Sequence, residues 1–286
     1  MILLLLFILF FYLNRKTRYE KTDYYLQTHN AFSSALFDKG ISGEYAIWKS
    51  LYTLGGYKKC LLNCYLPKNN QESTEIDLIL LHESGIHVFE SKNYSGWIFG
   101  TATQQNWTQV LPKGYGRSQK NKFFNPIFQN DVHLKWLGKY LNKKPESFYS
   151  YIVFGDHCTL KNITLTNDRH KVINRRDLFE AVNANVQSNC RKLTIDEIDT
   201  LYVKLLPFTQ MDSMQKAMHI EKIRKQRISS DSMSCTRTQT GPMRCPRCGG
   251  KLVLRTAKKG VHEGQNFWGC SNYPRCRYVK DANRHF

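Results

Sequence analysis

The chain has 286 residues, 41% of them hydrophobic and 13% aromatic, so it is long and apolar enough for one medium-sized domain with additional segments. It carries 42 basic residues against 23 acidic residues, a formal net charge of +19. This excess is too large for a neutral surface and favours a polyanionic partner, either nucleic acid or an anionic membrane.

The first thirteen residues, MILLLLFILFFYL, form an apolar run without a charged side chain, and a basic stretch, Asn14–Arg18, follows at once. The run is shorter than the ~20 residues of a full helical span, so a signal peptide is the competing interpretation. No basic segment precedes the run and no small-residue cleavage site follows it, which argues against cleavage. We therefore expect a membrane anchor at residues 1–13 and, by the positive-inside rule, the bulk of the chain in the cytoplasm.

The middle of the chain, residues 40–206, predicts an α/β domain. A helix is expected from Ser42 until Gly55-Gly56 stops it, and a second helix begins at Asn125-Pro126, a cap residue followed by proline at the first helical position. The stretch Arg176–Leu206 is expected to be mostly helical, with Thr194 capping its last segment. Strands are predicted at Lys59–Leu66, Ile76–Leu81, Ile86–Ser91 and Tyr149–Phe154. The order helix, three-stranded meander, helix, strand indicates a mixed sheet.

Two polar segments flank this domain, a tyrosine-rich connector at residues 14–39 and a linker at residues 207–241. Four of the nine cysteines have metal-ligand spacing, which fits a reducing compartment better than a disulfide scaffold. Alternation along the first strand would place Cys60, Leu62 and Cys64 on one face, where small buried thiols are expected.

The segment IDLILLHESGIHVFES, residues 76–91, contains two apolar runs around a predicted tight turn. If the strands pair symmetrically about this turn, Asp77 lies opposite Glu90 on one face of the hairpin. The Cβ atoms of directly opposed residues lie about 5 Å apart, and two like charges there are unfavourable unless a cation lies between them. Because carboxylate oxygens suit Mg²⁺ or Mn²⁺, the hairpin predicts a hard-metal site.

Other side chains could complete this site. Lys92 could orient or deprotonate a water and stabilise charge on a phosphate, or it could simply pair with Glu75 across the hairpin. Glu44 on the first helix could add an acid, although the helix macrodipole alone favours an acid near a helix start. Gln129 and His133, one turn apart on the second helix, could face the same cleft or be ordinary polar residues of a helix surface.

Several short motifs occur in order along roughly residues 40–154: Gly43-Glu44, Glu75-Ile-Asp77, Val88-Phe-Glu-Ser-Lys92-Asn-Tyr-Ser-Gly96-Trp97 and Asn125-Pro126-x-x-Gln129. Together they resemble the nuclease-related domain (NERD), a branch of the restriction-endonuclease-like PD-(D/E)xK superfamily. The resemblance implies a restriction-endonuclease-like core in which Asp77 and Glu90 bind the metal and Lys92 assists the water. It also implies that Glu44 and Gln129 complete the site. The chain departs from the superfamily pattern in having no proline before Asp77.

The C-terminal segment, residues 242–283, contains two cysteine pairs with a longer excursion between them. Paired thiolates at such spacings close tetrahedral Zn²⁺ sites in zinc ribbons, and we expect Cys245, Cys248, Cys270 and Cys276 to be the ligands. Gly249-Gly250 would let the first pair turn tightly, and Leu252–Arg255 and Gln265–Trp268 would form the strands.

The surroundings of the cysteines are basic, with ten lysines and arginines against two acidic residues from Gly241 onward. Cations for phosphates and aromatic rings for bases are the ingredients of single-strand binding. The candidate nucleic-acid contacts are Arg255, Lys258, Lys259, Trp268, Tyr273, Arg275 and Arg277. Alternatively, at least two of the four aromatic residues fill the ribbon core. The segment resembles the C-terminal zinc ribbons of type IA DNA topoisomerases, which implies DNA binding.

The sequence thus predicts a membrane-tethered, metal-dependent nuclease that hydrolyses DNA phosphodiester bonds, with a zinc ribbon that holds the nucleic acid. The alternative is a catalytically inactive, membrane-tethered adaptor that binds DNA. RNA as the substrate is a third hypothesis that the sequence does not separate from DNA.

Overall fold

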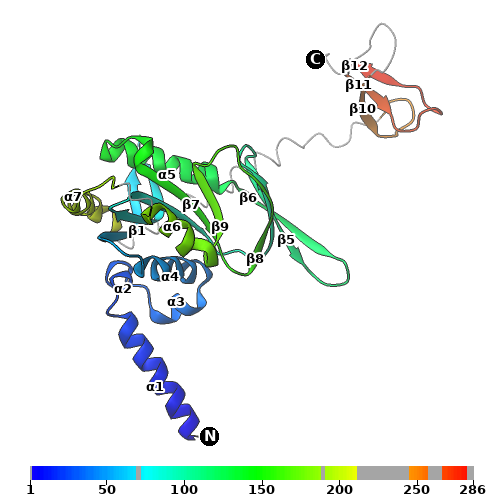
Figure 1. The fold of residues 1–286 in the computed structure, drawn as a ribbon. Coiled ribbons are helices and arrows are strands. Elements are labelled where there is room, and N and C mark those ends of the chain that lie inside the picture. Colours follow the sequence, from blue (N-terminus) through cyan, green and yellow to red (C-terminus); the bar gives the residue numbers. More distant parts are fainter. Residues whose placement is uncertain (1, 69–71, 188–190, 211–244, 257–265, 282–286) are drawn as a thin grey trace. The chain divides into compact units, whose positions relative to one another are not determined.

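A computed structural model describes residues 2–68, 72–187, 191–210, 245–256 and 266–281 of the chain. The chain divides into two compact units, residues 1–213 and residues 214–286 (Figure 1). The predicted linker at residues 207–241 begins with the short 3-10 helix η4 (Leu206–Thr209), and from residue 211 onward it lies outside the described residues.

The larger unit is built on a five-stranded sheet with the order β1-β2-β3-β7-β9. Its strands are β1 (Lys58–Pro67), β2 (Ser73–His82), β3 (Gly85–Lys92), β7 (Phe148–Phe154) and β9 (His170–Asn174). The first three form an antiparallel meander, while β7 pairs with β3 and β9 pairs with β7 in parallel. The predicted α/β class with a mixed sheet is therefore confirmed.

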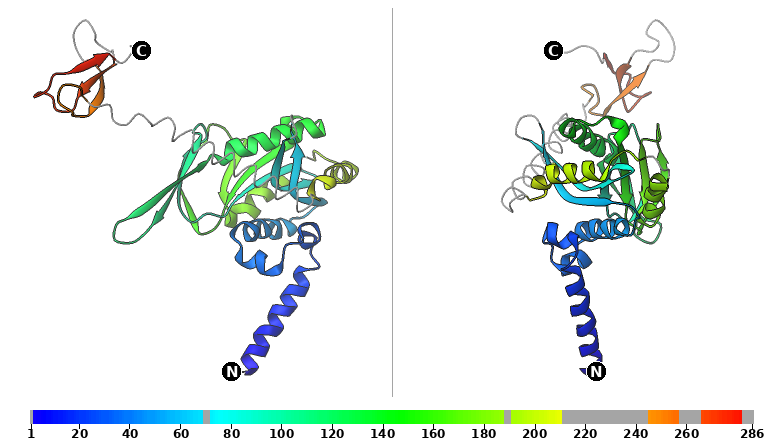
Figure 2. Two further views of the ribbon diagram at one scale, coloured as in Figure 1. Left: turned by 180° about the vertical axis from the view of Figure 1, so that it is seen from behind. Right: turned by 60° about the vertical axis from the view of Figure 1, so that its left-hand side comes forward.

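Helices cover both faces of this sheet. Helices α4 (Lys39–Tyr52) and α6 (Leu178–Gln187) pack on one face, and α5 (Pro126–Leu141) and α7 (Ile195–Leu205) pack on the other. In Figure 2, α4 in blue and α5 in green lie on opposite sides of the strands. We call the two buried layers the α4 core and the α5 core.

Alternation along the strands feeds both cores. Leu78 and Leu80 of β2 enter the α4 core, while Ile79 and Leu81 enter the α5 core, as the two-residue period of a strand requires. The prediction that Cys60, Leu62 and Cys64 share one face was wrong. Cys60 and Leu62 pack in the α4 core, but Cys64 is buried in the α5 core, because the backbone at the intervening residue is left-handed.

The helix boundaries follow from capping. Asn125 accepts a hydrogen bond from the Ile127 backbone N–H at 2.9 Å, so α5 begins as predicted. A capping box formed by Thr194 and Glu197 starts α7. Helix α4 begins earlier than Ser42, because Asp38 accepts the backbone N–H of Ile41 at 3.0 Å.

The segment before α4 is largely helical. It contains α1 (Ile2–Tyr19), α2 (Asp23–Thr28) and α3 (Phe32–Phe37). The rings of Tyr19 and Tyr24 are buried and contribute to the α4 core, so the predicted connector is part of the packing of the larger unit.

A second sheet lies beside the first and was not predicted. Its order is β6-β5-β4-β8, from β4 (Gly96–Thr101), β5 (Asn106–Pro112), β6 (Ser118–Phe124) and β8 (Cys158–Thr164). Trp107 of β5 is fully buried and stacks on Phe154 of β7, with ring centroids 6.2 Å apart. This small core joins the two sheets behind the candidate site.

The predicted membrane anchor falls on α1, whose apolar side chains from Ile2 to Leu13 are exposed. No helix among the described residues has both the length and the apolar character needed to cross a bilayer.

Candidate functional site

The β2–β3 hairpin has the predicted register. Leu78 pairs with Phe89 and His82 pairs with Gly85, so the strands are symmetric about the expected turn. The paired ladder ends at Leu78, one step before Asp77 and Glu90. There the Asp77 carboxylate accepts the backbone N–H of Ser91 at 2.7 Å, so a side chain replaces a strand hydrogen bond. Asp77 is thus held against the end of β3.

A buried ion pair forms the centre of the site. The Lys92 ammonium donates to Glu90 Oε1, and the Glu90 side chain is 1% exposed. Lys92 also donates to Gln129 Oε1 of α5 at 3.2 Å. Burial alone would raise the pKa of Glu90, but the Lys92 charge and the His133 hydrogen bond outweigh it and lower the pKa. Glu90 is therefore an ionised carboxylate at neutral pH.

His133 holds the second oxygen of this carboxylate. Its Nε2 lies 3.0 Å from Glu90 Oε2, and its Nδ1 lies 2.8 Å from the Thr74 hydroxyl of β2. With Nε2 protonated and donating to the carboxylate, Nδ1 accepts the Thr74 proton, so every polar atom in this chain is satisfied. Thr74 was not predicted, and no sequence signal singles it out. The structure brings Gln129 and His133 together with Glu90 and Lys92, on one side of α5.

Further carboxyl groups crowd around Asp77. Burial and the charges of Glu90 and Glu44 raise the pKa of Asp77 well above its usual value. Burial and the charge of Glu75 raise the pKa of Glu44 on α4 to about 8. Glu75 accepts a hydrogen bond from the Tyr65 hydroxyl at 2.6 Å. We call Glu44, Glu75, Asp77 and Glu90 the acid cluster.

The acid cluster suits a hard cation better than a soft one, because its donors are carboxylate oxygens. Lys92 is the cation described within it, and the raised pKa values of Glu44 and Asp77 reflect negative charge that one ammonium does not balance. A divalent cation held by Asp77 and Glu90 would relieve this repulsion. Within the described residues, however, the metal-ligand geometry of three or more closely spaced donors occurs in the cysteines and not in the acid cluster. The role of each acid stays a prediction.

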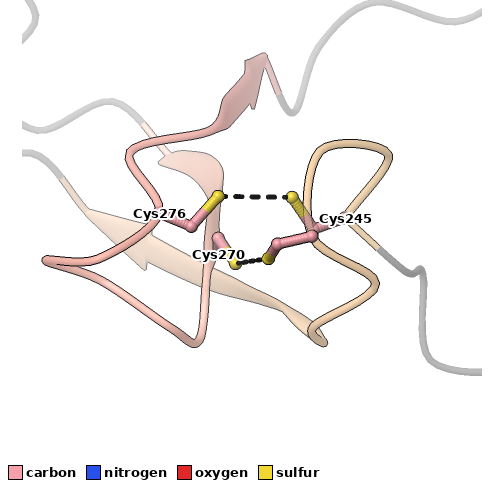
Figure 3. Close-up of side chains that lie close together, drawn as sticks. Cys245, Cys270 and Cys276 are labelled. Carbon is pink, nitrogen blue, oxygen red and sulfur yellow. Dashed lines mark hydrogen bonds between the residues drawn. The ribbon is translucent and has the colours of Figure 1, made fainter.

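The four predicted cysteines do converge in the smaller unit, as Figure 3 shows for the three that it labels. All four Sγ atoms lie within 4.8 Å of one another, and the Cys245–Cys276 separation is 3.7 Å. Four thiolates about 2.3 Å from a central Zn²⁺ would lie about 3.8 Å apart in a tetrahedron. The donors therefore fit a structural zinc site.

The ribbon has the predicted strands and one more. Strands β10 (Leu252–Thr256) and β11 (Asn266–Cys270) pair antiparallel, and β12 (Val279–Asp281) joins β11. Gly249 has φ +71°, so it makes the predicted tight turn in the first cysteine pair. The Gly250 backbone N–H and the neighbouring Cys270 thiol lower the pKa of Cys248 to about 7, which favours the thiolate that binds zinc.

The predicted nucleic-acid contacts of the ribbon differ in exposure. Trp268 and Tyr278 pack against the cysteine core, so these two aromatic residues fill the ribbon, as the alternative anticipated. Tyr273 is 59% exposed, and the Arg255 guanidinium lies 5.9 Å from its ring centroid. Arg275 and Arg277 are also exposed. Lys258 and Lys259 lie outside the described residues.

Comparison with known proteins identifies both parts of the chain. Residues 39–155 match the family described as nuclease-related domain, and residues 243–285 match the family described as topoisomerase DNA binding C4 zinc finger. An uncharacterized protein of Bacillus anthracis is 28% identical over 184 residues, which cover 64% of this chain and 82% of the relative.

Other similarities are confined to the ribbon. DNA topoisomerase 1 of Methanocaldococcus jannaschii is 52% identical over 40 residues, which cover 14% of this chain and 5% of the topoisomerase. The uncharacterized protein YrdD of Escherichia coli is 50% identical over 36 residues, or 13% of this chain and 17% of YrdD. No solved structure matches the chain. The chain therefore combines a nuclease-related domain with a topoisomerase-type C4 zinc ribbon.

Proposed function

We propose that this chain is a metal-dependent nuclease that hydrolyses phosphodiester bonds of DNA. The observation that carries the proposal is the buried Lys92–Glu90 pair beside Asp77, inside the domain that matches the nuclease-related family. An ionised acid, a second acid and a lysine at adjacent strand ends form a set of groups that suits hydrolysis of a phosphate ester.

In this proposal Asp77 and Glu90 hold Mg²⁺ or Mn²⁺, which when bound supplies charge stabilisation at the phosphate. The protein groups then have separate tasks. His133 and Thr74 fix the orientation of the Glu90 carboxylate through hydrogen bonds of 3.0 and 2.8 Å. Burial would lower the pKa of Lys92, but Glu90 and Asp77 raise it, so Lys92 stays protonated. Lys92 therefore serves as a hydrogen-bond donor to a phosphate oxygen or to the attacking water and not as a base.

The ribbon supplies nucleic-acid binding in the same proposal. The exposed cations Arg255, Arg275 and Arg277 would contact phosphates, and the exposed ring of Tyr273 would stack on a base. Because the zinc ligands are four cysteines with no open position, zinc would be structural here.

A cleavage assay tests the nuclease. The purified chain is incubated with single-stranded DNA, duplex DNA and RNA, each with Mg²⁺, with Mn²⁺ and with a chelator. We expect metal-dependent cleavage that Asp77→Asn and Lys92→Ala abolish, while Asp168→Asn, a change of the same chemistry at an exposed site, leaves it intact. Equal cleavage by the Asp77 variant and the parent would refute the assignment. A salt-sensitive gel shift with no cleavage in either metal would instead favour the inactive adaptor.

We also propose that α1 attaches the chain to a membrane, with the bulk of the chain in the cytoplasm. The proposal is supported by the contiguous exposed apolar side chains of residues 2–13, which would otherwise face water. Fractionation of cells that express the chain with and without residues 2–13 tests it. Recovery of both forms in the soluble fraction would refute it.

A further inference from the structure

The backbone of β1 is irregular at one residue. Asn63, near the middle of this ten-residue strand, has φ +49°, in the left-handed region. This conformation is disfavoured for residues that carry a Cβ atom, although asparagine tolerates it better than most. Such outliers persist only where the surrounding structure imposes them, and they cluster at functional sites.

The irregularity reverses the faces of two strands. Leu62 pairs with Leu78 in the α4 core, and two residues further Cys64 pairs with Ile76 in the α5 core. Residues two apart in a regular strand lie on the same face, so both strands are creased between these pairs. The register is unchanged across the crease, and its central rung is therefore Asn63 opposite Asp77.

The Asn63 side chain connects this crease to the acid cluster. Its amide hydrogen-bonds to the carboxyl group of Glu44, which projects from α4. Glu44 and Asp77 in turn interact through their charges. Asn63 thus links the helix that carries one acid to the strand that carries another. A glycine would adopt the same backbone with less strain but would have no amide to offer Glu44.

We propose that Asn63 is a positioning residue of the acid cluster, whose amide holds the Glu44 carboxyl toward Asp77 so that the cluster can bind a divalent cation together with a phosphodiester. This inference rests on the proposed nuclease function. It adds to that function a residue that no sequence motif singles out.

Two substitutions separate the backbone from the side chain. Asn63→Gly keeps the left-handed backbone and removes the amide, whereas Asn63→Ala removes the amide and strains the backbone. Asn142→Gly is the matched control, because Asn142 also has a left-handed backbone, φ +52°, but lies exposed at the C-terminal cap of α5. Each variant of the full chain is measured for Mn²⁺ affinity by calorimetry, for DNA cleavage and for melting temperature.

We expect both Asn63 variants to bind Mn²⁺ and to cleave DNA about tenfold or more weakly, the usual loss when a residue that orients a metal ligand is removed. Only Asn63→Ala should lower the melting temperature, by about 2–4 °C, and Asn142→Gly should match the parent in Mn²⁺ affinity and cleavage. If Asn63→Gly binds Mn²⁺ as the parent does, the amide has no positioning role and the inference is wrong.

A double-mutant cycle shows whether Asn63 acts through Glu44. In a Glu44→Gln background, Asn63→Gly should cause little further loss of Mn²⁺ affinity, because the carboxyl that it positions is already gone. The same tenfold loss in both backgrounds would overturn the inference. Failure of the proposed function looks different, because the parent itself would then not cleave DNA in any metal. The Mn²⁺ affinities would still decide the role of Asn63, and a parent that does not bind Mn²⁺ would overturn the inference together with the metal site.

Discussion

Replacing Lys92 by methionine tests whether its charge neutralises a buried carboxylate. The side chains of Lys92 and Glu90 are 16% and 1% exposed, so the pair is largely withdrawn from water. Methionine keeps most of the length and the apolar stem of lysine but carries no charge. The variant therefore leaves the Glu90 carboxylate buried and held by the His133 hydrogen bond, with no ammonium beside it.

The expected cost follows from this burial. Removing one partner of a buried ion pair costs about 3–5 kcal/mol. For a unit of this size each kcal/mol corresponds to about 2–4 °C in melting temperature, so we expect a fall on the order of 10 °C at neutral pH.

The pH dependence gives the test its sign. In the parent, Lys92 and His133 outweigh burial and lower the pKa of Glu90, so Glu90 stabilises the fold above pH ~4.5 and this contribution is lost on acidification. In the variant, burial dominates and raises the pKa, so folding takes up a proton. Stability then falls as the pH rises above ~4.5, by about 1.4 kcal/mol for each pH unit up to the raised pKa. The difference between variant and parent should therefore grow with pH.

Thermal unfolding followed by circular dichroism from pH 5 to pH 8 measures this difference. Lys120→Met, which removes an exposed lysine from β6, is the matched control and should behave like the parent at every pH. A Lys92→Met variant that is as stable as the parent at pH 8, or less stable by the same amount at every pH, would show that Lys92 does not neutralise Glu90.

Three further predictions concern the acid cluster and the zinc ribbon. Asp77→Asn should abolish DNA cleavage yet raise the melting temperature at pH 8 more than at pH 5, because burial and neighbouring charges raise the pKa of Asp77 and the folded state must otherwise protonate it; an equal effect at both pH values would contradict this. His133→Ala should reduce cleavage by about 10–100-fold, and Thr74→Val should reduce it less, because Thr74 reaches the carboxylate only through the histidine; steady-state cleavage rates check the order. Cys248→Ser should lower the bound zinc, measured by atomic absorption, well below one equivalent for each chain and should leave Mn²⁺ binding unchanged, since the acid cluster and the cysteines lie in different units. Full zinc occupancy in this variant would argue against a four-cysteine site.

Much of the fold could be predicted because it depends on local pattern. The register of the β2–β3 hairpin follows from two alternating runs around a short turn, since a slip of one residue would expose every core side chain. The start of α5 follows from Asn125 and the proline after it. The zinc ribbon follows from cysteine spacing, because a metal with fixed bond lengths constrains neighbouring ligands more strongly than packing does.

The second sheet could not be predicted in the same way. Strand β6, with the sequence SQKNKFF, is mostly exposed and polar, so it carries no alternation of apolar residues that would mark it as a strand. Its position depends on Trp107 of the neighbouring β5, which is buried against Phe154 of the first sheet. Such a contact joins residues that are far apart in the chain, and no local pattern records it.

The acid cluster shows both sides of this distinction. The sequence by itself determined that Asp77 and Glu90 approach each other, because a tight hairpin leaves only one register that keeps the core buried. It did not determine which carboxyls are ionised, or that His133, Thr74 and Asn63 hold them. Those properties arise where two helices meet a creased sheet, since burial and the charges of residues distant in sequence set each pKa, and these come together only when the chain folds.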